Sequence, residues 1–340
     1  MEILIAGAGA IGCWIGANLL RAGHHVTFVG RGAFVEAVQS RGLQVALPDG
    51  GRWSFEPAAL CAFESVRAAA EAQSFDATLL CVKSYALAAA LDEMHPHAER
   101  LGQIVTFQNG VGAEEQAAEI FNLQRMTAGT LTSPISSAAF GEIALDRLGG
   151  GVGLADLAPG VGFAERFRRE CGGEHMSIEV FADFRAMKWS KMLLNIVGNA
   201  SSALFDVDVA QVYADPRLFA LEMRMVRECV AVMRALKIAV VNLPGYSARL
   251  FAWVSAHLPD ALARLLLASR VARGRGGKRP SFYTDVANCT GRSEVGALNG
   301  RIAEHAAQLG IAAPVNRWLT DELLRRASTP GSRTELPSEL

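Results

Sequence analysis

The sequence has almost no net charge and no long apolar run, and each absence excludes a class of protein. Its 340 residues carry 33 Lys and Arg against 34 Asp and Glu, a formal net charge of −1 at pH 7. No charge excess therefore favours nucleic acid or an anionic membrane as a partner. No apolar run approaches the length needed to span a bilayer. The chain opens directly on a strand-like segment, so no signal peptide is expected.

The sequence also lacks the cysteine and histidine patterns of a metal site. Its six cysteines are scattered at Cys13, Cys61, Cys81, Cys171, Cys229 and Cys289. They form no C-x-x-C pair, and no histidines cluster with them at metal-site spacing, so no metal is expected. Most of these thiols lie in apolar runs, which is typical of buried structural cysteines. A reducing, cytoplasmic setting is therefore expected.

A glycine-rich stretch near the N-terminus gives the strongest functional signal. Residues Ile3–Gly12 read ILIAGAGAIG, an apolar run followed by three glycines and a helix-compatible segment. In a strand–turn–helix unit, Gly7 permits the tight turn, Gly9 lets backbone approach a pyrophosphate, and Gly12 lets the helix pack closely. The helix N-terminus then presents N–H groups and partial positive charge to phosphates. The pattern predicts a dinucleotide-binding α/β domain.

The residues after the second expected strand, Val26–Val29, bear on which dinucleotide binds. An NAD-type site places an acidic residue there to hold the ribose 2′-hydroxyl. This chain has Gly30, Arg31 and Gly32 instead. A guanidinium suits a 2′-phosphate. The alternative is a solvated loop arginine, and we favour NADPH.

Polar side chains follow two further buried strands. Lys83 comes after the apolar run Ala77–Val82, and Asn109 follows the run Gln103–Phe107. In open α/β sheets ligands bind beyond the carboxyl ends of the strands, so both residues are expected at the cofactor. Either residue alone is compatible with ordinary turn chemistry.

The hydrophobic pattern divides the chain into two domains. The length and the 51% hydrophobic content suit a two-domain enzyme with a large core. Residues 1–182 alternate strand and helix signals, with a hairpin at Gly42–Phe55 expected at the edge of the sheet. Residues 183–326 are almost wholly helical in pattern. The tail, 327–340, is expected to be frayed.

Polar residues form one stripe on the first helix expected in the second domain, Asp183–Leu204. On a continuous helix Lys191, Asn195 and Asn199 share one narrow face, with Lys188 beside them. The remaining faces are apolar, so the helix should be buried and its polar stripe should meet partners or a ligand. The alternatives are a solvent-facing stripe and one satisfied by neighbouring helices.

Two later segments carry candidate functional residues. Ser293 and Glu294, preceded by Ser281, read by themselves as the start of a helix. The stretch Arg270–Arg279 gathers five basic residues among glycines. It is interpreted as a solvated loop, or as a lid that meets cofactor phosphates or a substrate carboxylate. It lacks interleaved aromatics, so no nucleic-acid partner is expected.

Together these motifs resemble the ketopantoate reductases (2-dehydropantoate 2-reductases), over nearly the whole chain to about residue 320. The motifs that carry the resemblance are GAGAIG at Gly7–Gly12, Arg31, Val82-Lys83-Ser84, Gln108-Asn109-Gly110-Val111-Gly112, Trp189-Ser190-Lys191 with Asn195 and Asn199, and Ser281 with Ser293-Glu294. The resemblance implies an N-terminal Rossmann domain and an all-α C-terminal domain of the 6-phosphogluconate dehydrogenase type. It also implies an active site in the cleft between them.

The resemblance further implies a reaction and a role for each residue. The reaction is the NADPH-dependent reduction of 2-dehydropantoate to pantoate, for pantothenate and coenzyme A synthesis. The implied catalytic residues are Lys191, as the general acid, and Glu294, as a partner for the substrate and for orientation at the cleft. The implied cofactor-binding residues are Gly7, Gly9, Ala10, Ile11, Gly12, Arg31, Lys83 and Asn109. The implied substrate-binding residues are Asn109, Asn195, Asn199 and Ser281.

Two departures from the family pattern leave the substrate open. The family commonly has an acidic residue two positions after the glutamate, where this chain has Gly296, and the segment Phe282–Ser293 is unusual in composition. The alternatives are a reductase of the same fold that acts on another 2-oxo acid, and a non-catalytic NADP(H)-binding sensor. The apolar stretches Leu250–Val254 and Ala261–Ala268 are compatible with a core or with a homodimer face.

Overall fold

The chain packs into two compact units. The computed structural model describes residues 1–275, 282–283, 286, 293–329 and 334. The first unit comprises Met1–Gln108, Gly112–Met187 and Leu243–Tyr246, and the second comprises Asn109–Val111, Lys188–Asn242 and Ser247–Leu340. The tripeptide Asn109–Val111 thus leaves the α/β part of the chain and packs with the helical part.

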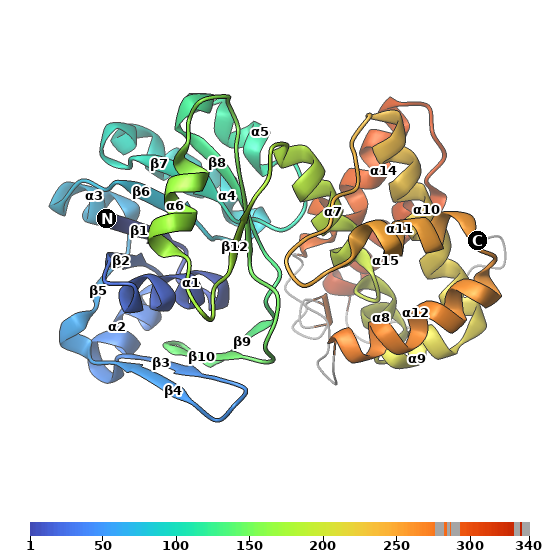
Figure 1. Ribbon diagram of the computed structural model, residues 1–340, viewed down its shortest axis with the longest axis horizontal. Coiled ribbons are helices and arrows are strands. Elements are labelled where there is room, and N and C mark those ends of the chain that lie inside the picture. The colour runs from blue at the N-terminus through green and yellow to red at the C-terminus, as the bar shows by residue number, and fades with distance from the viewer. Residues whose placement is uncertain (276–281, 284–285, 287–292, 330–333, 335–340) are drawn as a thin grey trace. The chain divides into compact units, whose positions relative to one another are not determined.

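An eight-stranded sheet forms the centre of the first unit (Figure 1). Its strands are β1 (Glu2–Ala6), β2 (His25–Val29), β5 (Cys61–Phe63), β6 (Ala77–Leu80), β7 (Gln103–Thr106), β8 (Met126–Leu131), β11 (Val152–Asp156) and β12 (Ile178–Val180). Their order is β12-β11-β8-β7-β6-β1-β2-β5. The run from β5 to β8 is parallel, and β11 pairs antiparallel with β8. The carboxyl ends of the parallel strands therefore meet at one edge, as a dinucleotide site requires.

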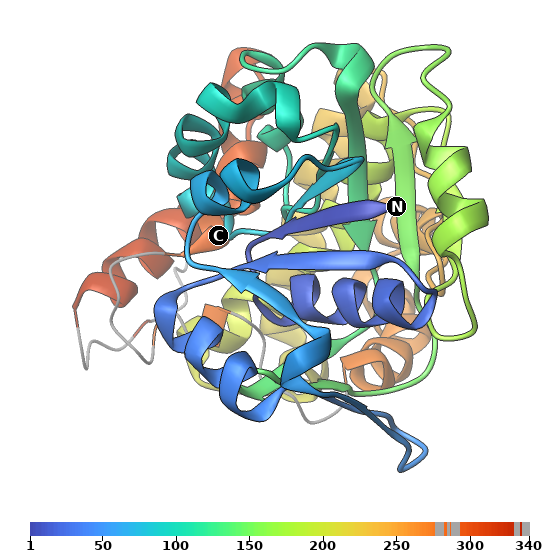
Figure 2. The ribbon, with the colours of Figure 1, turned by 90° about the vertical axis from the view of Figure 1, so that its left-hand side faces the viewer.

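Helices cover both faces of this sheet (Figure 2). They are α1 (Ala10–Arg21), α2 (Gly32–Arg41), α3 (Val66–Ala72), α4 (Leu87–Met94), α5 (Ala113–Ala118) and α6 (Phe163–Cys171). Ile3 and Ile5 of β1 join a core with α1, α2 and α6, whereas Leu4 and Ala6 join another with α3, α4 and α5. A strand buried on both faces reads as a continuous apolar run, which is why β1 was recognisable in the sequence.

A second, four-stranded sheet lies against α1. Its strands are β3 (Leu43–Ala46), β4 (Arg52–Phe55), β9 (Ile135–Ala139) and β10 (Glu142–Leu145), in the order β4-β3-β10-β9. The expected hairpin at Gly42–Phe55 is therefore confirmed, but its expected place at the edge of the main sheet is wrong. β5 occupies that edge beside β2, while Trp53 of β4 stacks on Trp14 of α1 with ring centroids 5.5 Å apart. The stacking of Trp53 on Trp14 favours packing of the hairpin against α1.

Helices build the second unit around the 20-residue α10. The helices that the structure describes there are α7 (Phe184–Ile196), which begins in the first unit, α8 (Ala200–Phe205), α9 (Val209–Ala214), α10 (Pro216–Ala235), α11 (Ala248–His257), α12 (Asp260–Arg275), α14 (Asn299–Gln308) and α15 (Pro314–Ser328). The short 3-10 helices among the described residues are η1 (Pro57–Ala59), η2 (Ser84–Ala86), η3 (His95–Arg100), η4 (Leu123–Arg125) and η5 (Glu294–Ala297). Asp215 starts α10 by accepting the N–H groups of Arg217 and Leu218. The expected fold class, an α/β domain followed by an all-α domain, is confirmed.

The expected single helix Asp183–Leu204 is wrong, because the chain turns between α7 and α8. Gly198 adopts a left-handed φ of +61° within this turn. Glu222 of α10 is fully buried and accepts the Gly198 N–H at 2.7 Å and the Ser201 hydroxyl. A buried carboxylate thus stabilises the turn between the two helices. Asn199 lies after this turn and does not continue the helical stripe of Lys191 and Asn195.

Part of the basic stretch and of the C-terminal tail can be placed. The backbone of α12 is helical through Arg275, so the first half of Arg270–Arg279 is helix rather than loop, and 276–279 lie outside the described residues. The helix α15 extends to Ser328, and most of the tail beyond it also lies outside them.

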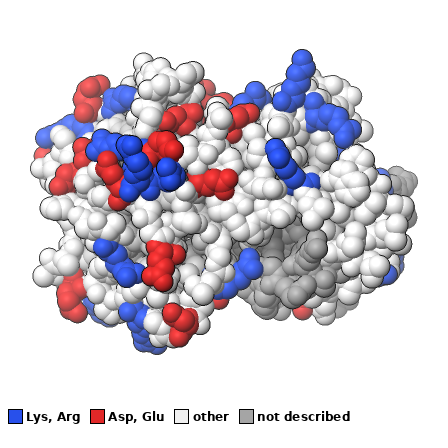
Figure 3. All heavy atoms as spheres, viewed as in Figure 1, with Lys and Arg blue, Asp and Glu red and all other residues white. Residues whose placement is uncertain are grey.

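The surface in view carries both signs of charge. Around α6, Lys and Arg side chains alternate with Asp and Glu (Figure 3), and Arg166 pairs with Glu170 at 3.0 Å. Of the helices the structure describes, none combines the length and apolarity that crossing a membrane demands.

Candidate active site

Close backbone packing shapes the glycine turn between β1 and α1. The N–H groups of Gly7 and Ala8 donate to the Val29 carbonyl at 3.0 and 2.9 Å, which ties the turn to β2. Gly7 has a φ of +108°, and a Cβ there would lie 2.6 Å from the Val82 nitrogen. A Cβ at Gly12 would lie 2.3 Å from the Gly7 carbonyl oxygen. Helix and strand therefore approach as closely as dinucleotide-binding turns require.

The start of α1 faces open space. Gly9 is the exposed N-cap, and a Cβ added to it would meet nothing within 4 Å. The first helical hydrogen bond runs from the Cys13 N–H to the Gly9 carbonyl at 2.8 Å, so the N–H groups of Ala10, Ile11 and Gly12 precede it. An uncapped helix start beside open space fits a phosphate group.

Two basic side chains follow the strand ends of the same edge. Arg31 and Lys83 are both exposed, at the N-cap positions of α2 and η2. The Arg31 guanidinium carbon lies 5.2 Å from the centre of the Phe140 ring. A Cβ at Gly30 would lie 2.6 Å from Cδ1 of Phe34, so the acidic residue of an NAD-type site has no room directly after β2.

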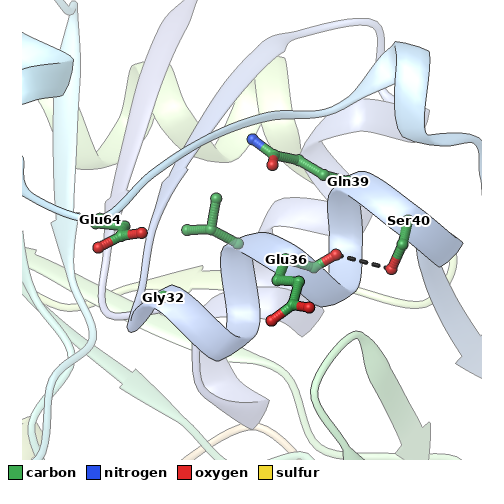
Figure 4. Close-up of a pocket in the computed structure, with 6 residues that line it drawn as sticks. Gly32, Glu36, Gln39, Ser40 and Glu64 are labelled. Carbon is green, nitrogen blue, oxygen red and sulfur yellow. Dashed lines mark hydrogen bonds between the residues drawn. The ribbon is translucent and has the colours of Figure 1, made fainter.

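An open pocket beside α2 contains an acidic residue that the sequence analysis missed. The residues that line it are Gly32, Val35, Glu36, Gln39, Ser40 and Glu64 (Figure 4). A Cβ at Gly32 would lie 3.2 Å from Oε1 of Glu64. Glu64 directly follows β5, the strand next to β2. The three residues of β5 are too few to be recognised as a strand in the sequence, so the carboxylate at its end went unnoticed.

The helical unit brings three of the predicted asparagines together. Nδ2 of Asn195, on α7, donates to Oδ1 of Asn109 at 3.1 Å. Nδ2 of the buried Asn199 donates to the Asn195 carbonyl at 3.2 Å, and its Oδ1 accepts the Phe282 N–H at 3.2 Å. Lys191 lies half-buried one helical turn before Asn195. The chain after β7 is thus held by the helix that carries the candidate general acid.

The same tripeptide approaches the short helix that carries Glu294. Gly110 has a φ of +88°, and a Cβ there would lie 2.1 Å from the carbonyl oxygen of Ala297, at the end of η5. Glu294 is only 4% exposed, and the Ser293 hydroxyl accepts the Val295 N–H at 3.2 Å. The expected helix start at Ser293 and Glu294 is therefore confirmed as a single 3-10 turn. Ser281 lies outside the described residues.

Burial makes most of the thiols unreactive. Desolvation raises the pKa of Cys13 to about 12, and burial also raises the pKa of Cys81 and of Cys229. Protonated, buried thiols do not act as nucleophiles or metal ligands. Within the described part of the chain, no three His, Cys, Asp or Glu side chains gather as metal ligands would.

Comparisons with known sequences point to one family over most of the chain. The model of the family "Ketopantoate reductase PanE/ApbA" matches residues 3–157, and the model of its C-terminal domain matches residues 183–327. A 2-dehydropantoate 2-reductase of Halobacterium salinarum is 30% identical over 97% of this chain and 100% of its own length. A second, from Pyrococcus horikoshii, is 26% identical over 93% and 94% of the two chains.

Solved structures give the same result. A PanE/ApbA family ketopantoate reductase from Ralstonia eutropha superposes with a TM-score of 0.77 at 25% identity, over 96% of this chain and 98% of the other. A D-mandelate dehydrogenase solved with NADH and anilino(oxo)acetate shares the fold, with a TM-score of 0.79 at 20% identity over 96% and 98% of the two chains. The chain belongs to the ketopantoate reductase family of oxidoreductases, as its motifs predict.

Proposed function

We propose that the protein reduces 2-dehydropantoate to pantoate with NADPH, and that Lys191 supplies the proton. The observation that carries the proposal is the hydrogen bond from Asn195 to Asn109, which attaches the loop after β7 to the helix of Lys191. Asn109, which we assign to the substrate or the cofactor ribose, is thereby fixed in the same helical unit as Lys191. The family and the names of the relatives support the same activity.

A nicotinamide cofactor, when bound, supplies the hydride that reduces the ketone carbon. The helix start at Gly9 would hold its phosphates, and Arg31 would bind the 2′-phosphate of NADPH. Lys191 donates a proton to the developing alkoxide and stabilises its negative charge as an ammonium. Asn109, Asn195, Asn199 and Ser281 hold the substrate or the cofactor ribose, and Glu294 orients the reacting groups.

Replacement of Lys191 tests the catalytic proposal. Lys191→Ala should lower kcat by about 10² to 10⁴, because it removes the proton donor and the cation together. The assay is steady-state oxidation of NADPH with 2-dehydropantoate. Lys237→Ala, an exposed lysine of the same unit, is the matched control and should retain wild-type turnover. Wild-type turnover of Lys191→Ala would contradict the assignment.

The same assay with a panel of 2-oxo acids tests the substrate. Gly296 favours the alternative of a different 2-oxo acid, because a Cβ there would meet no atom of the described residues within 4 Å. Turnover confined to another 2-oxo acid would replace 2-dehydropantoate as the proposed substrate. The proposed cofactor and the role of Lys191 would be unaffected. Cofactor binding without turnover of any of them would favour the sensor.

A homodimer in a reducing, cytoplasmic setting completes the proposal. Exposed apolar side chains gather on two helices that pack together, at Leu250 and Trp253 of α11 and at Leu262, Leu265 and Leu266 of α12. We propose that these side chains form one apolar patch, which is typical of an interaction site. The thiols of Cys13, Cys61, Cys81, Cys171 and Cys229 are unpaired, which suits a reducing compartment.

A further inference from the structure

The Phe140 ring lies against the side chain that the proposed function assigns to the 2′-phosphate. Its centre is 5.2 Å from the guanidinium carbon of Arg31, within the range of a cation–π contact. The ring is 40% exposed, so it is not primarily a core residue. Contact with Arg31 therefore explains the position of this apolar side chain at the surface better than packing in the core does.

The turn that carries the ring is fixed without help from Arg31. Phe140 lies between β9 and β10 of the four-stranded sheet, whose strands pack against α1. The next residue, Gly141, accepts the Gln44 N–H at 2.8 Å. A Cβ at Gly141 would also lie 2.9 Å from the Gly42 carbonyl, just after α2. The ring is therefore a preset surface on which the guanidinium rests.

We infer that Phe140 is a positioning residue that holds the Arg31 guanidinium for the cofactor 2′-phosphate. This inference rests on the proposed NADPH preference. A free arginine side chain samples many rotamers and loses that freedom when it binds a phosphate. Contact with the flat ring restricts the guanidinium beforehand, so less entropy is lost on binding. NADH has no 2′-phosphate, so the ring favours NADPH alone.

Replacement of the ring should change the discrimination between the two cofactors. Exposed cation–π contacts contribute about 0.5–1 kcal/mol, so Phe140→Ala should raise the ratio of the NADPH Kd to the NADH Kd about two- to five-fold. Phe140→Leu should behave like Phe140→Ala because it keeps apolar bulk but loses the ring, and Phe140→Tyr should restore the ratio. The two Kd values are measured by fluorescence titration, with kcat and KM measured beside them. Leu148→Ala, which changes another exposed apolar residue of the same unit, should leave the ratio unchanged.

A double-mutant cycle separates the inference from the proposed function. With Arg31→Ala in place, Phe140→Ala should have no further effect on the ratio. An unchanged ratio in Phe140→Ala, when Arg31→Ala raises it, would overturn the role of Phe140 and leave the NADPH site standing. A lowered ratio would mean that the ring draws Arg31 away from the phosphate, which also overturns the inference. If Arg31→Ala itself leaves the ratio unchanged, the proposed NADPH site fails and the inference fails with it.

Discussion

Glu64 places a carboxylate beside the loop that we propose binds the 2′-phosphate. Its Oε1 lies 3.2 Å from where a Cβ of Gly32 would be, at the end of the strand next to β2. A carboxylate at this edge can accept the ribose 2′-hydroxyl of NADH, and it repels a 2′-phosphate. Arg31 and Glu64 therefore favour opposite cofactors.

Removing this charge should sharpen the preference for NADPH. Glu64→Gln is expected to lower the KM for NADPH by up to about five-fold at low ionic strength, since exposed charges a few ångströms apart interact by about 1 kcal/mol. The gain should shrink as salt is added, because salt screens exposed charges. Glu36→Gln, which neutralises a second carboxylate lining the same pocket, is the control and should have a smaller effect. A raised KM for NADPH in Glu64→Gln would contradict the prediction.

Among the elements, local pattern predicts the strands well and the helix boundaries less well. The apolar run before Gly7 is sufficient to predict β1, because a strand buried on both faces needs apolar side chains throughout. The break between α7 and α8 was missed, although Gly198 and Asn199 are a common turn signal. The apolar periodicity continues across the break, and Glu222, which stabilises it, lies on another helix. The contribution of Glu222 depends on tertiary packing, which the sequence of the α7–α8 segment alone does not reveal.

The candidate site follows the same division between local and tertiary information. The position of Lys83 and Asn109 at strand ends could be predicted, since parallel strands end at a common edge. The transfer of Asn109 to the helical unit could not, because it depends on the amide pair with Asn195 and on the approach of Gly110 to Ala297. Phe140 was missed for the same reason, since β9 was not recognised in the sequence.

Glu228 attaches the last helix to the centre of the helical unit. From α10 it accepts the N–H groups of Val315 and Asn316, in the first turn of α15, at 3.0 and 2.9 Å, and the Asn316 amide at 2.7 Å. Glu228→Gln replaces one acceptor oxygen with a donor and should lower the free energy of unfolding by about 1–3 kcal/mol. Chemical denaturation monitored by circular dichroism measures it, and Glu304→Gln, on the exposed side of α14, is the control.

The effect of this substitution should depend on pH. Desolvation raises the pKa of the Glu228 carboxyl above its ordinary 4.5, and the hydrogen bonds to Asn316 and Val315 offset only part of the rise. Because the pKa is higher in the folded state than in the unfolded state, the protonated carboxyl contributes to the stability of the fold. This contribution is complete below pH 4.5 and is lost as the pH rises through the folded-state pKa. The difference between Glu228→Gln and wild type should therefore be larger at acidic pH than at neutral pH. A difference that grows from acidic to neutral pH would contradict this sign.

For the whole molecule, the exposed apolar face of α11 and α12 has a consequence for assembly. Leu265 is 78% exposed and Trp253 is 54% exposed. In a monomer such side chains stay in water at a cost of about 25 cal/mol for each Å² of apolar surface, and a homodimer that covers them recovers this free energy.

The proposed homodimer should therefore depend on this face. We expect sedimentation velocity to give a dimer for the wild type and a monomer for Leu265→Asp, because a buried, unpaired carboxylate opposes association. The melting temperature of the wild type should rise with protein concentration, and that of the variant should not. Leu148→Asp changes an exposed leucine of the first unit and should remain dimeric. A dimeric Leu265→Asp would place the interface elsewhere, and a monomeric wild type at every concentration would remove the homodimer from the proposal.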